Sequence, residues 1–258
     1  MSEIKSEKKS SLPVAIIGLV LLAAIGGGAW LYNQGGKPGG VKPAANVANK
    51  TSTVDYKTAL PGAEPAWSKG ANNASVVIEE FADLACPQCA RVTPILHEVR
   101  SSYGDKVKLI FRQFPLEIPA HKNAYDAAKA AEAAGMQGKF WEMENILFKN
   151  QTLWQPVADP RPLFEDYAKQ IGLNVEQLKT DMVGMPATMR VDADKKRGKA
   201  LNVMSTPSVY LNGKLLELKD TEPENLKKLI DAELAKTSGA TTANTANTNT
   251  ANTNTAAK

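Results

Sequence analysis

The chain has 258 residues, of which 43% are hydrophobic and 22% charged, and its 31 basic and 27 acidic side chains give a formal net charge of +4. This composition is that of one ordinary globular domain with atypical ends. The charge is mild, and no dense Lys/Arg stripe is interleaved with aromatic residues, so no nucleic-acid partner is expected. The chain has only two cysteines, so no further thiol is present to form a structural disulfide.

The N-terminal part of the chain carries an apolar stretch that predicts a membrane anchor. Lysines occur within residues 1–12, and the 19 residues Val14–Tyr32 contain no charge, a length that can cross a bilayer. By the positive-inside rule, residues 1–12 are a cytoplasmic N-terminus and residues 13–32 a signal-anchor, which places the folded domain on the extracytoplasmic side of the cell membrane. A cleaved signal peptide is the alternative, and both interpretations export the domain.

Two segments of biased composition flank the predicted domain. Residues 33–60 are predicted to be a flexible linker, because their Gly, Pro, Asn, Ala and Lys residues bury too little apolar surface to become ordered. Residues 237–258 are rich in Thr, Ala and Asn and are predicted to form a disordered tail. The folded domain is therefore expected at residues 61–236.

The domain begins with a strand, a helix and a second strand. Residues 75–82 (SVVIEEFA) are a β-branched run typical of a strand. The next helix begins at Pro87, contains Pro94 and ends at Gly104, since apolar residues recur at helical spacing between them. Residues 106–114 first alternate and then run apolar, which predicts the second strand.

Several helices, a hairpin and a closing helix are predicted next. Helical composition with Gly or Pro breaks predicts a compact subdomain with helices at residues 121–134, 139–150, 161–171, 175–183 and 187–202. Asn212-Gly213 joins residues 207–211 and 214–218 as a β-hairpin, and residues 222–236 form an amphipathic helix. This order predicts an α/β fold whose sheet is interrupted by a helical insertion at about residues 119–202.

Cys86, Pro87, Gln88 and Cys89 form a CxxC motif where the first strand passes into the helix. Two thiols at this spacing can close a disulfide and pass it to another protein by thiolate exchange. Cys86 lies at the helix start, where unsatisfied N–H groups lower its pKa below about 8.5 and make it the nucleophile. Cys89 is one turn further in and more shielded, which suits the resolving role. Pro87 and Gln88 add no charge, so we expect a moderately oxidising couple.

Half of a zinc site is the main alternative for an isolated CxxC. Zinc needs two more ligands, and the two histidines, His97 and His121, are 24 residues apart on separate predicted helices. No metal and no bound cofactor are therefore predicted, since the sulfur atoms carry the electrons themselves. We interpret His97 as a helix-surface residue and His121 as a residue that caps or packs the first helix of the insertion.

Four local patterns resemble the DsbA-like branch of the thioredoxin superfamily: EFADLACPQC at Glu80–Cys89, FRQFPLE at Phe111–Glu117, AAEAAGMQGKFWEM at Ala130–Met143 and STPSVYLNG at Ser205–Gly213. The resemblance extends from about residue 70 to residue 236. It implies a thioredoxin fold with a helical insertion between the two halves of the sheet.

The resemblance also implies roles for residues outside the CxxC. Thr206-Pro207 matches the cis-proline loop that lies against the CxxC and binds substrate chains, and Glu80 matches the buried acid that shuttles the proton of the resolving thiol, with a pKa raised by burial. From the residues alone, the alternatives are an ordinary trans turn and a solvated strand-end carboxylate. The latter is our interpretation of Glu79, and we expect Asp83 to make a turn or cap bond.

Three hypotheses for the function follow. The first is an exported, membrane-tethered thiol–disulfide oxidoreductase that introduces disulfides into reduced exported proteins, acts as a monomer and, as the resemblance implies, is reoxidised by a membrane partner of DsbB or VKOR type. The second is a disulfide reductase or isomerase of the same fold, because Gln88 and Thr206 replace the histidine and valine of strongly oxidising DsbA enzymes. The third is a tethered peptide-binding module without enzymatic activity.

Overall fold

The computed structural model describes residues 55–248 of the chain, with the side chains of residues 55–237. The predicted cytoplasmic N-terminus, the signal-anchor, most of the linker and the last residues of the tail lie outside this range. Among residues 55–248, no helix combines the length and the apolar character that a membrane span requires.

A mixed five-stranded sheet with the order β1-β3-β2-β4-β5 forms the centre of the domain. Its two long strands, β2 (Val76–Ala82) and β3 (Val107–Gln113), are parallel. The short strand β1 (Trp67–Lys69) is antiparallel to β3, β4 (Ser208–Leu211) is antiparallel to β2, and β5 (Lys214–Leu215) is antiparallel to β4. The helical insertion between β3 and β4 therefore interrupts one sheet, which confirms the predicted α/β class.

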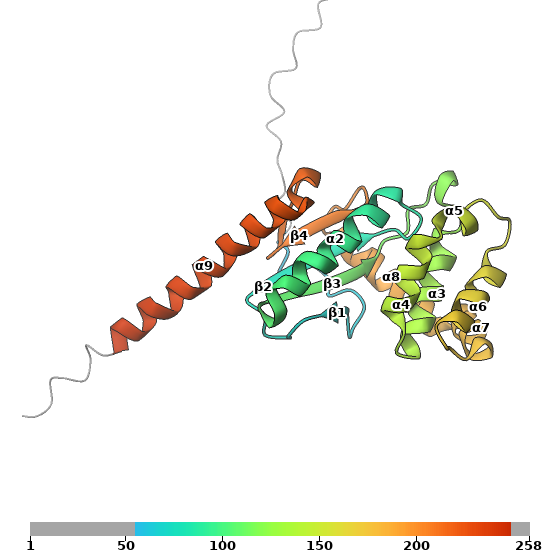
Figure 1. Cartoon of the computed structure of the whole chain (residues 1–258), viewed down its shortest axis with the longest axis horizontal. Helices are drawn as coiled ribbons and strands as arrows, with labels where there is room; N and C mark the ends of the chain where they lie inside the picture. The colour runs from blue at the N-terminus through green and yellow to red at the C-terminus, as the bar shows by residue number, and fades with distance from the viewer. Residues whose placement is uncertain (1–54, 249–258) are drawn as a thin grey trace, which may run out of the picture. The chain divides into compact units, whose positions relative to one another are not determined.

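Helices cover both faces of this sheet, as the alternation of side chains along β2 shows. Glu80 bonds to Thr93 of α2 (Pro87–Tyr103), whereas its neighbour Glu79 bonds to Arg197 of α8 (Met185–Ala200). Successive residues of a strand point to opposite faces, so α2 and α8 lie on opposite sides of the sheet. α9 (Pro223–Thr248) packs beside α2 through Leu226 and Ile230, which share a buried cluster with apolar residues of α2 (Figure 1).

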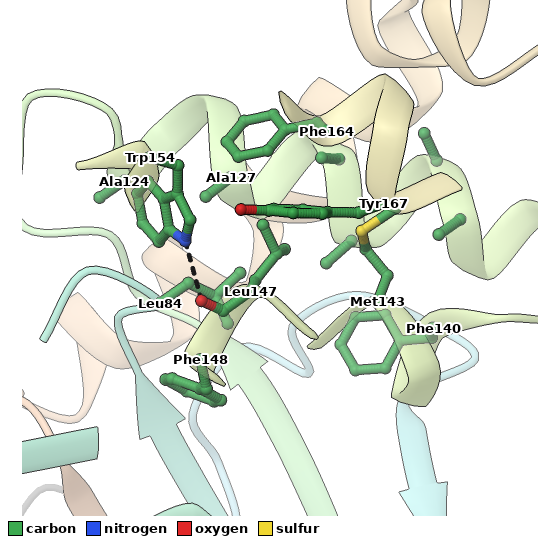
Figure 2. Close-up of a cluster of buried hydrophobic side chains, with 14 of the residues drawn as sticks. Leu84, Ala124, Ala127, Phe140, Met143, Leu147, Phe148, Trp154, Phe164 and Tyr167 are labelled. Atoms are coloured by element: carbon green, nitrogen blue, oxygen red, sulfur yellow. Dashed lines mark hydrogen bonds between the residues drawn. The ribbon is translucent and has the colours of Figure 1, made fainter. Parts of the chain in front are cut away.

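The insertion is a compact group of helices beside the sheet (Figure 1). In chain order its elements are η2 (Pro119–His121), α3 (Ala124–Met136), α4 (Phe140–Lys149), α5 (Gln151–Trp154), α6 (Arg161–Gln170), α7 (Val175–Val183) and α8. Figure 2 shows its core, in which the buried indole of Trp154 packs near Phe164 and donates a hydrogen bond of 2.8 Å to the carbonyl of Leu147. This shared core fixes the insertion to the sheet, because Phe111 of β3 belongs to the same cluster.

The end of the predicted linker is part of the folded domain, which corrects its boundary at residue 60. Tyr56 donates a hydrogen bond of 2.6 Å to Glu79, and Arg197 donates one of 2.7 Å to the carbonyl of Leu60. The segment is ordered by buried charges of β2 and α8 that need these partners. The composition of this segment indicated only that it cannot form a core by itself.

Three further elements differ from their predictions. β1 was not predicted, because three residues are too short for a recognisable alternation. The second hairpin strand ends at Leu215 and is followed by η3 (Leu218–Thr221). The closing helix continues to Thr248, past the expected end at Lys236 and into the segment expected to be disordered. Once a helix is anchored by packing, each added residue gains a backbone hydrogen bond, and alanine favours this extension.

Candidate active site

The CxxC motif lies at the carboxyl end of β2, where the chain turns into α2. Cys86 is the N-cap of α2, and its N–H donates a hydrogen bond of 2.9 Å to the carbonyl of Asp83. The side chain of Asp83 accepts a hydrogen bond of 2.7 Å from the N–H of Ala85, so the expected turn bond is present. Pro87 occupies the first helical position, where a missing N–H costs nothing. The turn thus fixes Cys86 at the positive end of the helix.

The two thiols have opposite proton affinities. The pKa of Cys86 is lowered to about 5, because the Cys89 thiol and the backbone N–H groups of Gln88 and Cys89 stabilise its thiolate against the opposing effect of burial. Cys89 is fully buried, and burial, its hydrogen bond to Cys86 and the charge of Glu80 raise its pKa. Cys86 is therefore suited to be the nucleophile and Cys89 to be the resolving thiol.

The loop before β4 lies against Cys86. The Thr206–Pro207 peptide bond is cis, and Cys86 Sγ lies 3.4 Å from the carbonyl oxygen of Thr206. Thr206 Oγ1 is buried and has no hydrogen-bond partner among the described residues. The Thr206 side chain also helps to lower the pKa of Cys86. Pro207 is half-buried, and Gln88 is half-buried on the first turn of α2 with its amide toward Arg91.

Glu80 lies beneath the motif as a fully buried acid. One carboxylate oxygen accepts a hydrogen bond of 2.7 Å from Thr93, and the other has no partner among the residues that the structure describes. Burial raises the pKa of Glu80 to about 8, and the charges of Glu144 and Cys86 contribute in the same direction. An acid with this pKa can both accept and donate a proton near neutral pH.

Two glutamines of the insertion hold the active-site loop, and no sequence signal pointed to them. Gln151 donates hydrogen bonds of 2.7 and 3.0 Å to the carbonyls of Leu84 and Cys86. Gln155 donates one of 2.6 Å to the carbonyl of Ala85. The loop that presents the nucleophile is thus fixed by residues that lie about 65 to 70 positions further along the chain.

The two histidines lie in different places. His121 Nδ1 is 2.7 Å from the side chain of Asp83, so it supports the active-site turn as well as the start of the insertion. His97 is half-buried between α2 and α4, near Glu144, which corrects its interpretation as a surface residue. The described residues contain no group of three or more His, Cys, Asp or Glu side chains arranged to bind a metal ion.

Glu79 is fully buried, so its interpretation as a solvated carboxylate is wrong. It accepts hydrogen bonds of 2.8 Å from Arg197 and 2.7 Å from Arg112. Burial alone would raise the pKa of Glu79, but these two guanidinium groups hold it below its usual value. Strand alternation directs Glu79 away from the CxxC and toward α8, so it belongs to the opposite face of the sheet from Glu80.

A stabilised thiolate at a helix start, a buried second thiol and a buried acid define a thiol–disulfide exchange site. The sheet that carries it is interrupted by a group of helices, as the resemblance predicts for the fold. A family model described as Thioredoxin matches residues 63–232. The chain belongs to the thioredoxin family.

Solved structures of DsbA-like proteins share this fold. The oxidised crystal structure of BdbD from Bacillus subtilis matches with a TM-score of 0.58 and 24% identity, over 69% of this chain and 98% of that one. alpha-DsbA1 from Wolbachia pipientis matches with a TM-score of 0.57 and 20% identity, over 70% and 96% of the two chains. The family model confirms the thioredoxin family, and these structures confirm the predicted fold class. The two thiols and the buried acid have the chemistry of the predicted enzyme class, a protein thiol–disulfide oxidoreductase.

Curated relatives match only in part of their length. The Na(+)/H(+) antiporter NhaA 1 of Mycolicibacterium vanbaalenii is 37% identical over 149 residues, which are 56% of this chain and 23% of the antiporter. NhaA 1 of Salinispora arenicola is 30% identical over 146 residues, 57% of this chain and 21% of the antiporter. The chain thus spans less than a quarter of these relatives, so their antiporter activity is not assigned to it.

Proposed function

We propose that the chain is an exported, membrane-tethered oxidoreductase that introduces disulfides into secreted proteins through Cys86 and Cys89. The observation that supports this direction is the lowered pKa of Cys86, about 5. A stabilised thiolate favours the reduced form of the pair, and a disulfide whose reduced form is stabilised is a stronger oxidant. The proposed role as a disulfide donor rests on this stabilisation of the Cys86 thiolate.

The reaction transfers two electrons from the client protein to the disulfide form of the pair. A client thiolate attacks Cys86 Sγ, a mixed disulfide forms, and Cys89 leaves as a thiolate that takes a proton from Glu80. A second client thiolate then attacks the client sulfur of the mixed disulfide, which forms the client disulfide and releases Cys86 as a thiolate. In this proposal the client backbone binds to the loop at Thr206-Pro207, which lies against Cys86.

The proposed setting is the extracytoplasmic side of the cell membrane. The anchor at residues 13–32 would hold the domain near a membrane redox partner of DsbB or VKOR type, whose disulfide takes the two electrons from the reduced pair. Reduced exported proteins are the proposed clients, and the chain is proposed to act as a monomer.

Labelling a cysteine introduced into the exposed part of the domain, Lys196→Cys, with an impermeant reagent in intact cells tests the topology. If the reagent labels that cysteine only after the cells are lysed, the proposed extracytoplasmic location is contradicted.

The reduction potential of the Cys86–Cys89 couple tests the direction. The full-length chain is equilibrated with glutathione buffers, and its free thiols are counted by alkylation. A potential of about −120 to −180 mV is expected for a disulfide donor. A potential near about −270 mV, in the range of thioredoxin, would instead make reduction the working function.

Exchange itself is tested by trapping. A Cys89→Ala variant lacks the resolving thiol and should accumulate mixed disulfides between Cys86 and client proteins. The matched control is Cys86→Ala, which keeps one buried thiol and should capture none. A non-enzymatic peptide-binding module predicts no captured clients with either variant.

A further inference from the structure

A cavity of about 340 Å³ lies beside the redox helix, between α2, α4 and β1. Two of its lining residues lie on α2. Ala90 directly follows Cys89, the second thiol, and Pro94 directly follows Thr93, which binds Glu80. The opposite wall comes from the insertion and contains Trp141 and Glu144. The cavity therefore borders the buried side of the active site.

Glu144 is a buried carboxylate on α4 that faces the redox helix. It is 4% exposed, and one of its oxygens lies 3.4 Å from His97 Nε2 on α2. The other ring nitrogen of His97 lies 3.1 Å from Lys69 Nζ on β1, and the ring meets Trp141 edge-on at 5.1 Å between centroids. Three elements thus hold the Glu144–His97 pair in one position.

Two residues on one face of α2 bring a second carboxylate close to Glu80. Thr93 and His97 are four residues apart, so their side chains lie one turn apart on α2. Thr93 binds Glu80 and His97 contacts Glu144. Two successive turns of α2 therefore hold the two buried carboxyl groups, one through Thr93 and the other through His97.

We propose that Glu144 is a positioning residue for the resolving step: its carboxylate, held by His97 beside the buried acid, sets the pH at which Glu80 accepts the proton of Cys89. The inference rests on the proposed exchange reaction and adds to it a residue of the insertion. A second negative charge near a buried carboxyl group disfavours the ionised form of that group. The raised pKa of Glu80, to which Glu144 contributes after burial, agrees with this effect.

The resolving step shows why this proton affinity matters. Ionised Glu80 takes the proton of the Cys89 thiol, the Cys89 thiolate attacks Cys86 Sγ of a mixed disulfide, and the partner leaves as a thiolate that is protonated by solvent. The charged or titratable groups that face Glu80 are Cys86 and Cys89 of the active-site turn and Glu144 of α4. Those that face Glu144 are His97 of α2 and, beyond it, Lys69 of β1.

The test measures the resolving step directly. The reduced full-length chain is mixed with excess oxidised glutathione at a series of pH values, quenched with acid, and the glutathionyl adduct on Cys86 is followed by mass. In Glu144→Gln, the pH midpoint of adduct resolution should move down by about one unit, because ionised Glu80 no longer meets a second negative charge. Glu144→Asp, which keeps the charge, should restore the midpoint of the unmodified chain.

The matched control is Glu142→Gln on the same helix, where the side chain is exposed and pairs with Lys139. Its midpoint should equal that of the unmodified chain, whereas a merely structural effect of losing charge from α4 would move both variants alike. A profile of Glu144→Gln that coincides with the unmodified chain, or moves to higher pH, overturns the inference. If the unmodified chain forms no adduct or never resolves it, the proposed function itself fails.

A measurement on the unmodified chain covers the case in which Glu144→Gln does not fold. Carbon-13 NMR of glutamate carboxyl groups, with Glu80→Gln used to assign the signal of Glu80, should show the Glu144 signal responding at the midpoint of Glu80. The signal of a carboxyl group that lies near Glu80 should change when the charge of Glu80 changes. Independent titration of the two signals would overturn the proposal.

Discussion

Cys86 and Cys89 are one helical turn apart, and their surroundings give them different chemistry. Cys86 meets the free N–H groups of the helix start and the thiol of its partner, which stabilise its thiolate. Cys89 is enclosed by the core, and burial, its hydrogen bond to Cys86 and the charge of Glu80 raise its pKa, so it keeps its proton. The two thiols therefore differ in proton affinity because they differ in burial and in their position relative to the helix start.

The thiolate of Cys86 makes a direct prediction for its reactivity. Alkylation of the reduced chain by iodoacetamide should follow a titration with a midpoint at about pH 5, because only the thiolate reacts. Cys86→Ala should remove this phase and leave the buried Cys89 unreactive in the native state. A midpoint between about pH 8 and 9, as for an ordinary thiol, would contradict the stabilisation of the Cys86 thiolate.

Burial of Glu80 predicts how stability changes with pH in the disulfide form, where neither thiol titrates. Burial is the largest cause of the raised pKa of Glu80 and does not depend on the thiols, so in this form too the folded state binds more protons above pH 4.5 than the unfolded state. The free energy of unfolding should thus fall as pH rises above about 4.5, with a slope of at most about 1.4 kcal/mol per pH unit.

Urea unfolding across this pH range measures the effect. Glu80→Gln should remove the slope, whereas Glu98→Gln, an exposed change on α2, should keep it. An equal slope in Glu80→Gln and in the unmodified chain would show that Glu80 is not a buried neutral acid.

At the scale of elements, a buried charge cluster connects α8 to the far face of the sheet. Glu79 of β2 lies between Arg112 of β3 and Arg197 of α8, and Asp194 of α8 also contacts Arg112, at 3.0 Å. The same guanidinium groups bind the carbonyls of the segment that leads into the domain. The helix, the two central strands and the entering segment are thereby held in one arrangement.

Removing one partner of this cluster should destabilise the protein. Arg197→Met leaves Glu79 buried with one guanidinium fewer, and breaking a buried pair in this way costs about 3 to 5 kcal/mol. Lys196→Met, the exposed neighbour on α8, is the matched control and should change the free energy of unfolding by less than about 0.5 kcal/mol. Equal urea midpoints for the two variants would show that the cluster contributes nothing to stability.

At the scale of the whole molecule, the redox state of the pair and the stability of the fold are linked. Only the reduced form carries the Cys86 thiolate, and its pKa falls from an ordinary 9.0 to about 5 on folding. Because the unfolded reduced chain binds the extra proton, this stabilisation is fully present above about pH 9 and is lost as pH falls through about 5. The fold therefore favours the dithiol, in agreement with a disulfide donor.

Comparison of the two redox forms tests this linkage. As pH rises from about 5 to 9, the free energy of unfolding of the reduced form should increase relative to that of the disulfide form by about 1.4 kcal/mol per pH unit. Urea unfolding of both forms at several pH values gives the difference, and Cys86→Ala, which cannot form the thiolate, should lack the gain. A difference independent of pH would contradict a thiolate stabilised by folding.

Local features of the site were accessible from the sequence because they depend on a few neighbouring residues. The spacing of Cys86 and Cys89, Pro87 at the helix start and the turn bond of Asp83 all lie within one short segment. Asn212-Gly213 likewise encodes its hairpin, since both residues adopt the positive φ that the turn requires. The place of Glu80 came from the resemblance, because the residues alone left a solvated carboxylate open.

Taken by itself, the sequence determined the α/β class, the redox motif and the order of the main elements. Strand alternation, helical spacing and turn chemistry depend only on residues that are close together in the chain. Only the tertiary structure decided which acid is buried beneath the thiols, that Glu79 faces two arginines, and that Gln151 and Gln155 of the insertion bind the active-site loop. These contacts join residues that are far apart in the chain. Their partners are chosen by the packing of helices on the sheet, which no local pattern contains.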